Sequence, residues 1–417
     1  MHRLLNTLRP YAWGSTTAIA ELLGREPSGG PEAELWIGAH PDSPSQVHAG
    51  DQTQGTGLDR VIDGYPEAAL GEASIEAFGA RLPFLLKVLA ADRPLSLQVH
   101  PTLEQARAGF AAEDAAGVSR SAPDRNYKDD NHKPEMIFAL SRFEALCGFR
   151  SAADAAARFE ELTALLVGQG AAEVTEQVAE LLRDPDEEQA LRGAFARLIA
   201  GGGQVRAAVG AAAAAIIAAR ADDPGLRTVA ALAQDYADDP GVLVSLLLNR
   251  VTLEPGQALA LGAGNVHAYL SGLGIEVMAS SDNVLRGGLT TKHVDVAELL
   301  KTVRFASLPV PFLTAVESGL GQEIYRPPFD EFQLQRIRVA PQTGEDSREP
   351  VPVAQAGAAV VLVVEGSLTL DTPKGDLLLG RGESAFIPAV EAPALAHAGD
   401  DGVLAFAVTT NLGGDLG

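Results

Sequence analysis

The alternation of apolar and polar positions divides the chain into parts of different character. The first 150 residues contain short apolar runs interrupted by Gly and Pro, a pattern typical of β-strands joined by turns. Residues 103–113 have the spacing of a short helix instead, with Thr102 in the position of its N-cap. We predict strands at residues 34–38, 82–89, 94–99 and 135–140.

A helical pattern replaces the β pattern from about residue 151 to 237. Apolar residues recur there at helical spacing, as in Phe159, Leu162 and Leu166. We interpret this segment as an inserted α-helical domain that serves packing. Its Ala-rich run at 207–219 is predicted to be a buried helix, because it is shorter than the roughly 20 residues that span a bilayer. No membrane partner is expected.

The β pattern returns near residue 243 and continues to about 278. A linker-like stretch around residues 309–328 follows, and the final part of the chain again contains apolar β-type runs. These runs lie at 360–364, 367–370 and 384–387. The chain is therefore predicted to be mainly β, with helices inserted between two β portions.

Composition and charge restrict the partners and the compartment. The chain has 417 residues and a formal net charge of −23, so nucleic acid and anionic membranes are poor partners. An anionic substrate would need a local group of Lys and Arg. Cys147 is the only cysteine, which excludes an intramolecular disulfide and fits a reducing compartment. The chain does not open on a basic segment followed by an apolar one, so we expect a cytoplasmic protein.

The first candidate for metal chemistry is Gln98-Val99-His100, at the end of an apolar strand. Residues two apart in a strand share a face, so Gln98 and His100 can approach one point together. Taken alone, the motif also fits a polar strand end that faces solvent.

The second candidate is Asn131-His132-Lys133-Pro134-Glu135, which precedes an apolar strand. A carboxylate at the mouth of a buried strand usually has a charged partner or a metal. Taken alone, the motif also fits a surface turn with mixed charges.

The third candidate is the run from Gly256 through Gly262 and Gly264 to His267, which resembles the second signature of the cupin superfamily. In that fold the glycines form tight turns and the final His is a metal ligand. The family usually has Pro where Gly262 stands. The signature is short, so a core histidine with a hydrogen-bond partner fits His267 equally well.

Together the three motifs predict a metal site. Two imidazoles, one carboxylate and one amide oxygen suit one Zn²⁺ per chain, with Fe²⁺ or Mn²⁺ as alternatives. Since only one of these ligands is anionic, the metal keeps positive charge and suits a Lewis acid that polarises a substrate oxygen. The predicted ligands are Gln98, His100, Glu135 and His267.

A second group of charged residues follows the third motif. It places Glu276, Arg286 and Lys292 within seventeen residues of one another, around a Gly-containing loop. Arg binds a phosphate through two parallel hydrogen bonds and Lys as a point charge, so these cations are candidate anchors for a phosphate. A surface loop whose cations pair with the many acidic residues is the alternative. Further candidates from the first part of the chain are Lys87, Ser96 and Lys133.

Six stretches, in the same order, resemble the type I phosphomannose isomerase family. They are Tyr11–Gly14, Glu34–Pro41, Leu82–Leu89, Pro94–Pro101, Asn131–Glu135 and Ser281–Thr290. The resemblance implies the same four metal ligands and assigns a catalytic role to Arg286. It also places Ser96, Lys133, Tyr269, Glu276 and Lys292 at family site positions. Thr291 departs from the family, which usually has Pro before the lysine, and this makes the loop around Lys292 less rigid.

The resemblance also implies a fold. We expect cupin-type jelly-roll barrels, of which one bears the metal and one is C-terminal and empty, because Pro393 stands where the second barrel would have its metal-binding His. The expected metal-bearing catalytic domain combines residues 1–150 with 243–325. Residues 151–242 form the expected helical insert, and residues 326–417 the C-terminal cupin-like domain.

The implied activity is an aldose–ketose isomerisation between mannose 6-phosphate and fructose 6-phosphate, in a monomer that acts on a small sugar phosphate. We predict Glu276 as the base, with Lys133 and a metal-bound water as rivals. Two other classes remain open. One is a non-catalytic cupin-type sugar-phosphate-binding protein, and the other is a metal-dependent cupin oxygenase, whose iron triad also has two His and one carboxylate.

Overall fold

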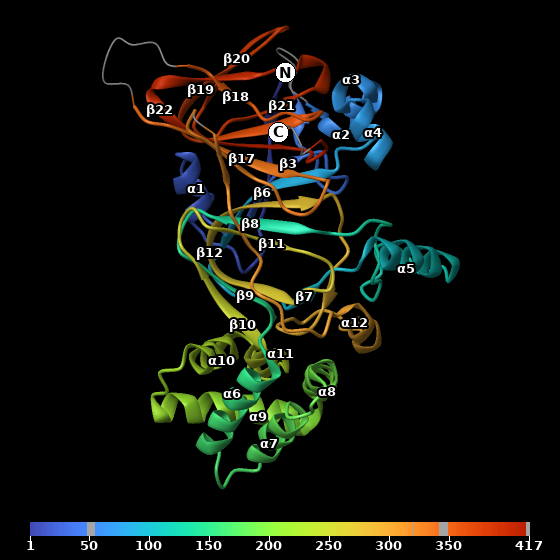
Figure 1. The fold of residues 1–417 in the computed structure, drawn as a ribbon, viewed down its shortest axis with the longest axis vertical. Helices are drawn as coiled ribbons and strands as arrows, with labels where there is room; N and C mark the ends of the chain where they lie inside the picture. The colour runs from blue at the N-terminus through green and yellow to red at the C-terminus, as the bar shows by residue number, and fades with distance from the viewer. Residues whose placement is uncertain (48–54, 319, 342–348, 414–417) are drawn as a thin grey trace.

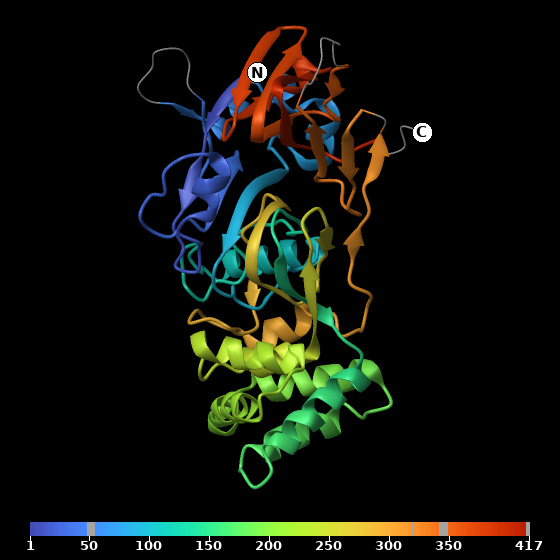
Figure 2. The same cartoon turned by 90° about the vertical axis from the view of Figure 1, so that its left-hand side faces the viewer.

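The computed structural model describes residues 1–47, 55–318, 320–341 and 349–413. The molecule is elongated and has three tiers (Figure 1). A β-sheet that contains the C-terminal strands forms one end, a second β-sheet forms the middle, and a group of helices forms the other end. The two sheets are both antiparallel, and Figure 2 shows the same three tiers from the side.

The middle sheet holds all of the strands that carry predicted site residues. Its main path runs β14-β11-β8-β12-β6-β3-β2. Strands β7 and β9 also pair with β12, and they pair in turn with β13 and β10. The bounds are β2 Thr7–Arg9, β3 Glu34–Gly38, β6 Phe84–Ala91, β7 Gln98–Val99, β8 Glu135–Ala139, β9 Phe143–Phe149, β10 Leu248–Leu253, β11 Ala258–Leu261, β12 His267–Ala279, β13 Leu285–Arg286 and β14 Phe312–Leu313.

Strands β6 and β8 lie in the centre of this sheet and every residue in them is buried, which explains their nearly continuous apolar sequences. The predicted strand at 34–38 is confirmed by β3. The predicted strand at 94–99 is mostly wrong, since β7 covers only Gln98–Val99. The residues before β7 are held by isolated backbone hydrogen bonds instead. Leu95 N donates to Tyr269 O, Leu97 N donates to Gly288 O, and Leu97 O accepts from Gly287 N.

Strand β12 is long and bent, and the bend decides which side chains share a face. Its register against β9 shifts between Tyr269 and Ser271, where β12 has one extra residue. Gly272 follows with φ +127°, and a Cβ atom there would lie 2.6 Å from the Phe143 ring. In a regular strand His267 and Glu276 would face opposite sides, since they are nine positions apart. The extra residue brings them to the same side.

The other sheet combines strands from both ends of the chain. Its path runs β15-β16-β17-β22-β19-β21-β1-β4-β5, with β18 beside β22 and β20 beside β19. The bounds are β1 His2–Leu5, β4 Gln46–Val47, β5 Thr56–Gly57, β15 Val316–Ser318, β16 Gln322–Tyr325, β17 Gln333–Val339, β18 Val351–Pro352, β19 Ala359–Thr372, β20 Gly375–Gly380, β21 Ser384–Ile387 and β22 Leu395–Thr409. The predicted linker at 309–328 is therefore wrong in part, because β14, β15 and β16 lie within it.

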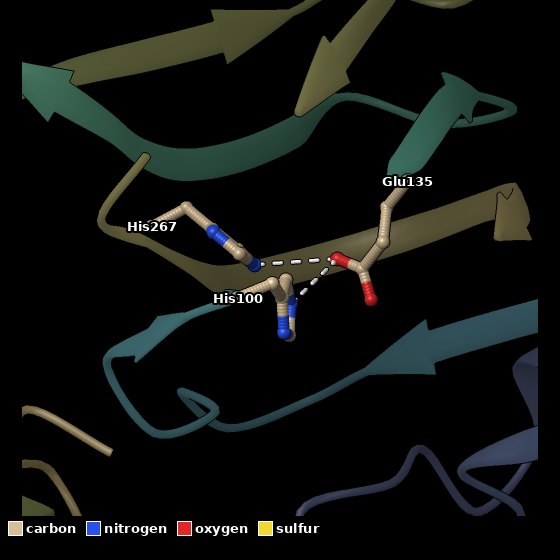
Figure 3. Close-up of side chains that lie close together, drawn as sticks. All are labelled: His100, Glu135 and His267. Atoms are coloured by element: carbon tan, nitrogen blue, oxygen red, sulfur yellow. Dashed lines mark ion pairs between the residues drawn. The ribbon is translucent and has the colours of Figure 1, made fainter. Parts of the chain in front are cut away.

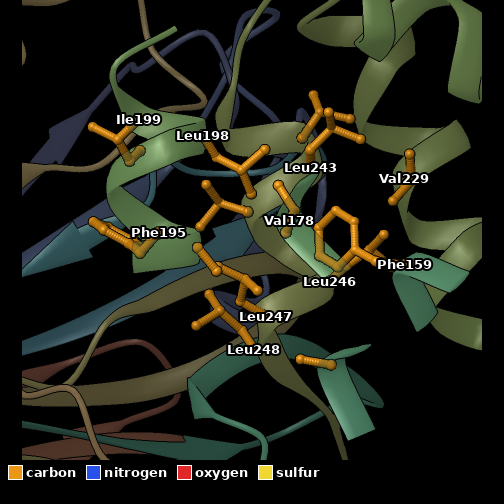
Figure 4. Close-up of a cluster of buried hydrophobic side chains, with 14 of the residues drawn as sticks. Phe159, Val178, Phe195, Leu198, Ile199, Val229, Leu243, Leu246, Leu247 and Leu248 are labelled. Atoms are coloured by element: carbon orange, nitrogen blue, oxygen red, sulfur yellow. The ribbon is translucent and has the colours of Figure 1, made fainter. Parts of the chain in front are cut away.

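The helices predicted after residue 151 all lie between β9 and β10 and pack into one apolar core with the end of the middle sheet (Figure 4). Phe159, Phe195 and Leu246 are fully buried there. The bounds are α6 Ala152–Leu165, α7 Ala172–Leu181, α8 Glu187–Ile199, α9 Gly202–Ala219, α10 Pro224–Asp235, α11 Gly241–Val244 and the 3₁₀ turn η1 Ser245–Leu247.

Helix α9 contains the Ala-rich run and is longer than that run. By length and composition alone it would suffice to cross a membrane, and it is the one such helix among the described residues. Its Val205, Val209 and Ile216 side chains are buried against the neighbouring helices, and it contacts α6, α7 and α10. Most of α9 is not buried, so the prediction of a buried helix is confirmed only for the face that packs on this tier.

The remaining helices lie around the two sheets. They are α1 Ala18–Leu23, α2 Leu58–Gly64, α3 Pro66–Leu70, α4 Glu72–Phe78, α5 Leu103–Ala115, α12 Val296–Thr302 and the 3₁₀ turn η2 Ala389–Glu391. The predicted helix at 103–113 is confirmed by α5. Thr102 and Gln105 form a reciprocal capping box at its start.

Candidate metal centre and active site

Three buried side chains from three strands of the middle sheet meet at one point (Figure 3). His100 directly follows β7, Glu135 begins β8 and His267 begins β12. Glu135 Oε2 lies 3.5 Å from His100 Nε2 and 3.3 Å from His267 Nε2. The separate motifs at His100, Glu135 and His267 thus form one group that can hold a metal.

Backbone carbonyls orient both imidazoles toward this point. His100 Nδ1 lies 2.7 Å from Asn283 O, and His267 Nδ1 lies 3.1 Å from Asn265 O. Each Nδ1–H therefore donates to a carbonyl and leaves a lone pair on Nε2, which is the tautomer that metal-binding histidines adopt. His100 Nε2 is buried without a hydrogen-bond partner in the described part of the chain. This orphaned acceptor fits a metal ion.

Burial also keeps His100 neutral, because it lowers the pKa of the imidazole to about 4, against the pull of nearby Glu135. Glu135 stays ionised. The Lys133 ammonium, 2.9 Å from Glu135 Oε1, and the neighbouring imidazoles hold the pKa of the carboxyl well below its ordinary value despite burial. Neutral imidazole and ionised carboxylate are the forms that bind a metal.

Gln98 lies beside this group by strand register. It is directly opposite His267 on β12 and opposite Arg286 on β13. Directly opposite residues of antiparallel strands point to the same face, so Gln98, His267 and Arg286 share one face of the sheet. Gln98 is only half-buried. The position is compatible with an amide oxygen as fourth ligand.

The His100 pKa predicts how the stability of the metal-free protein varies with pH. In the unfolded chain histidine takes up a proton below pH 6.5, whereas folded His100 stays neutral down to about pH 4. The unfolded state binds more protons in between, so the free energy of unfolding falls as pH falls, by on the order of 3 kcal/mol from this residue. Urea titrations of metal-free wild type and His100→Asn at pH 7 and 4.5 measure it. Between pH 7 and pH 4.5 the free energy of unfolding should fall less in His100→Asn than in wild type. An equal fall in both proteins would show that His100 is not the group responsible.

A buried network of charges lies on the same face of the sheet, next to Glu135. Lys87 Nζ lies 2.9 Å from Glu276 Oε2 and 3.6 Å from Glu34 Oε2, and 5.2 Å from the centroid of the Trp36 ring. Trp36 Nε1 donates to Glu34 Oε2 over 2.6 Å. Burial lowers the pKa of Lys87, but the neighbouring carboxylates outweigh this effect and raise it above the ordinary value. Burial raises the pKa of Glu276, and Lys87 opposes this. The lysine is therefore charged, and Glu276 is a carboxylate of increased basicity.

Glu34 and Trp36 were not predicted as site residues. The sequence did contain a signal for them, because they lie two apart in a stretch that resembles the family. In the structure this stretch is β3, and Trp36 lies opposite Lys87. Only the pairing of β3 with β6 shows that their common face is the one that carries Lys87.

Of the predicted phosphate anchors, Arg286 and Lys292 form a second cationic region, whereas Lys87 and Lys133 are paired with carboxylates. Burial lowers the pKa of Arg286, and Arg286 makes no ion pair within the described residues. Burial and the nearby charges of Arg286 and Lys128 lower the pKa of Lys292. Ser96 is half-buried. Its neighbours Leu95 and Leu97 are hydrogen-bonded to Tyr269 and to the Gly287–Gly288 loop, respectively. Lys128 is a further cation of this region, and the sequence did not predict it.

Tyr269 lies two residues after His267 and is fully buried, with 6.1 Å between the two ring centroids. Burial and the negative charges of Glu276 and Glu135 raise the pKa of its hydroxyl well above the ordinary value. The phenol is therefore neutral and can donate a hydrogen bond into the site.

A second group of possible metal ligands, His40, Asp42 and Asp282, lies beside this site. His40 Nε2 lies 3.5 Å from Asp282 Oδ1, and its Nδ1 accepts a hydrogen bond from Asp42 N. Arg120 Nη2 is 3.5 Å from both carboxylates. Since Nδ1 accepts, Nε2 carries the proton, and a guanidinium already compensates the acids. We assign no metal to this group.

These features define the class of protein: an antiparallel β-sheet protein with a buried His-Glu-His group that can hold a metal, a lysine–carboxylate network, and beside them an arginine that makes no ion pair within the described residues. The family model of the phosphomannose isomerase type I catalytic domain matches residues 1–152. The mannose-6-phosphate isomerase of Escherichia coli K12 is 42% identical over 397 residues, which cover 94% of this chain and 96% of that protein. Mannose-6-phosphate isomerase 1 of Arabidopsis thaliana is 33% identical and covers 86% of this chain and 81% of its own.

Solved structures agree with the sequence comparisons. A variant of phosphomannose isomerase from Salmonella typhimurium superimposes with a TM-score of 0.85 at 38% identity, and covers 98% of this chain and 99% of its own. A mannose 6-phosphate isomerase bound with zinc and yttrium has a TM-score of 0.83 at 39% identity, with 98% of each chain covered. The chain belongs to the type I phosphomannose isomerase family.

Proposed function

We propose that this protein interconverts mannose 6-phosphate and fructose 6-phosphate, with one Zn²⁺ held by Gln98, His100, Glu135 and His267. The single observation that carries the proposal is the buried His100–Glu135–His267 group beside the Lys87–Glu276 pair. A Lewis acid next to a base suits proton transfer between C1 and C2 of a sugar. The names of the relatives, which cover nearly the whole chain, support the substrate.

We further propose the cupin architecture for the two sheets. The metal-bearing catalytic barrel would combine residues 1–150 with 243–325, residues 151–242 would be the helical insert, and residues 326–417 the second barrel. The antiparallel pairing of both sheets supports this division. The apolar core around Ile337, Val361 and Leu370 supports a structural role for the second barrel. Five strands cross the division, because they pair within the C-terminal sheet: β1, β4, β5, β15 and β16.

In the proposed reaction Glu276 takes the proton from C2 of the open-chain aldose, and the electron pair of that bond forms the C1–C2 double bond as the C1 carbonyl becomes an enediolate oxygen. Glu276 then returns the proton to C1, the C2 hydroxyl proton passes to the C1 oxygen to give the C1 hydroxyl, and C2 becomes the ketone. When bound, the metal stabilises negative charge on the substrate oxygens. Lys87 orients Glu276 through the 2.9 Å contact, and buried Tyr269 and Lys133 donate toward the oxygens.

The phosphate would bind Arg286 and Lys292, with Ser96 as an uncharged donor and Lys128 nearby. Arg286 has no acidic partner in the described residues, so its charge is available to the ligand. The mutual repulsion of Arg286, Lys292 and Lys128 is relieved when a dianion binds between them.

Arg286→Lys is expected to raise the KM for mannose 6-phosphate by about 10- to 100-fold, because a charge-assisted hydrogen bond contributes roughly 1.5–3 kcal/mol. Steady-state kinetics measure this, with Arg304→Lys as a matched control on the segment after α12. A KM unchanged in Arg286→Lys would place the phosphate elsewhere.

We further propose a monomer that acts on a small sugar phosphate, and the names of the relatives support that substrate. The net charge of −23 supports the absence of nucleic acid and membrane partners, and the single buried Cys147 supports a cytoplasmic location.

Formation of fructose 6-phosphate from mannose 6-phosphate by the zinc-loaded protein tests the proposal. Unphosphorylated mannose should be a poor substrate. Tight binding without turnover would favour a sugar-phosphate-binding protein, and oxygen consumption with Fe²⁺ would favour an oxygenase.

A further inference from the structure

Two loops that flank the metal site are joined by a dense set of hydrogen bonds. One loop comprises residues 128–131, just before Lys133 and Glu135, and the other comprises residues 281–283, just before β13. Ser281 Oγ and Asp282 N each donate to the Asp129 carboxylate over 2.7 Å. We call the paired residues Asp129 and Asn283, with Ser281, the loop clamp.

Asn283 is the centre of the loop clamp and is completely buried. Its Nδ2 donates to Asp129 O and to Asn131 O over 2.8 Å each, and its Oδ1 accepts from Lys128 N over 2.7 Å. The amide therefore uses its donors and its acceptor on the backbone of a single loop. A side chain held in this way has one orientation, and its own backbone is equally fixed.

The backbone of Asn283 is the part that reaches the metal site. Its carbonyl accepts the Nδ1–H of His100 over 2.7 Å. This bond determines the tautomer of His100 and the direction of its unpartnered Nε2. The same residue leads through Val284 into β13, which ends in Arg286.

We propose that Asn283 is a positioning residue: its side chain anchors the 128–131 loop so that its own carbonyl aims His100 at the metal and its strand aims Arg286 at the substrate phosphate. The loop clamp thus connects the segment that supplies Lys133 and Glu135 to the bond that orients His100. Asn283 touches neither the reacting atoms nor the metal position. Outer hydrogen-bond partners of this kind change metal affinity by roughly 10- to 100-fold.

Zinc affinity tests this inference, which rests on the metal site of the proposed function but not on turnover. Metal-free Asn283→Ala is titrated with zinc in competition with a chromophoric chelator. We expect its zinc dissociation constant to rise by about 10- to 100-fold. Asn411→Ala is the matched control, since Asn411 Nδ2 likewise donates to two carbonyls, those of Pro327 and Phe329, and should leave the affinity unchanged.

A double-mutant cycle separates positioning from a general loss of stability. In a His100→Ala background, Asn283→Ala should cause no further loss of zinc affinity, because the bond that it aims is already absent. Asp129→Asn, measured in the same way, serves if Asn283→Ala does not fold, and should weaken zinc binding in the same direction.

Zinc affinity within about twofold of wild type in the folded variant, or an equal loss in the His100→Ala background, would overturn the inference. Wild type that binds zinc without isomerising mannose 6-phosphate would contradict the proposed function and leave this inference standing. Wild type that binds no zinc would overturn both.

Discussion

Glu135→Gln is expected to weaken zinc binding by about 10²- to 10³-fold and to lower turnover at limiting zinc by a similar factor. Glu135 is the only anionic member of the predicted ligand set, and its Oε2 faces both imidazole Nε2 atoms. Glutamine keeps the shape but not the charge. The change also leaves Lys133 buried without its carboxylate, which costs on the order of 3–5 kcal/mol of stability.

Competition titrations and equilibrium unfolding of the metal-free variant measure the two effects separately. Glu144→Gln is the matched control, because Glu144 is paired with Arg250 over 2.8 Å in the same sheet and contacts none of the predicted ligands. It should lose some stability and keep its zinc affinity. Normal zinc affinity in Glu135→Gln would show that the metal binds elsewhere.

Glu276→Gln is expected to lower kcat by about 10²- to 10⁴-fold without loss of zinc, the usual range for removal of a general base. The glutamine cannot accept the proton, whereas Lys87 still has Glu34 as a partner at 3.6 Å. Because burial raises the pKa of Glu276, the acidic limb of the wild-type pH–rate profile should lie above the ordinary carboxyl value.

Single-turnover and steady-state rates with zinc-saturated protein measure this effect. Glu34→Gln is the comparison, since it removes the other carboxylate from Lys87 and should lower kcat far less. Activity near wild type in Glu276→Gln would exclude Glu276 as base and favour Lys133.

The His100–Glu135–His267 group was predictable because its signals are local. Gln98 and His100 lie two apart at a strand end, and Glu135 lies at the mouth of an apolar strand. The proximity of His267 to Glu276 was not predictable in the same way. The bulge after Tyr269 changes the face on which later side chains lie, and no period-two pattern in the sequence shows it.

Long-range pairing accounts for most of the remaining differences. Strand β1 pairs with β21, so that His2 lies opposite Phe386, and no local pattern encodes a contact over that separation. The predicted linker contains β16, in which only Tyr325 is buried, so its sequence lacks a strand's usual apolar alternation. The loop clamp was missed for a related reason, since Asp129 and Asn283 are ordinary turn residues until the two loops meet.

The measurement that tests the account most directly is fructose 6-phosphate formation from mannose 6-phosphate before chelation, after chelation and after return of zinc. We expect that chelation abolishes turnover and that stoichiometric zinc restores turnover in wild type. Zinc at the same concentration should not restore turnover in Glu135→Gln. Turnover that survives complete removal of the metal would contradict a zinc-dependent isomerisation. A lack of turnover in the zinc-loaded wild type would contradict it as well.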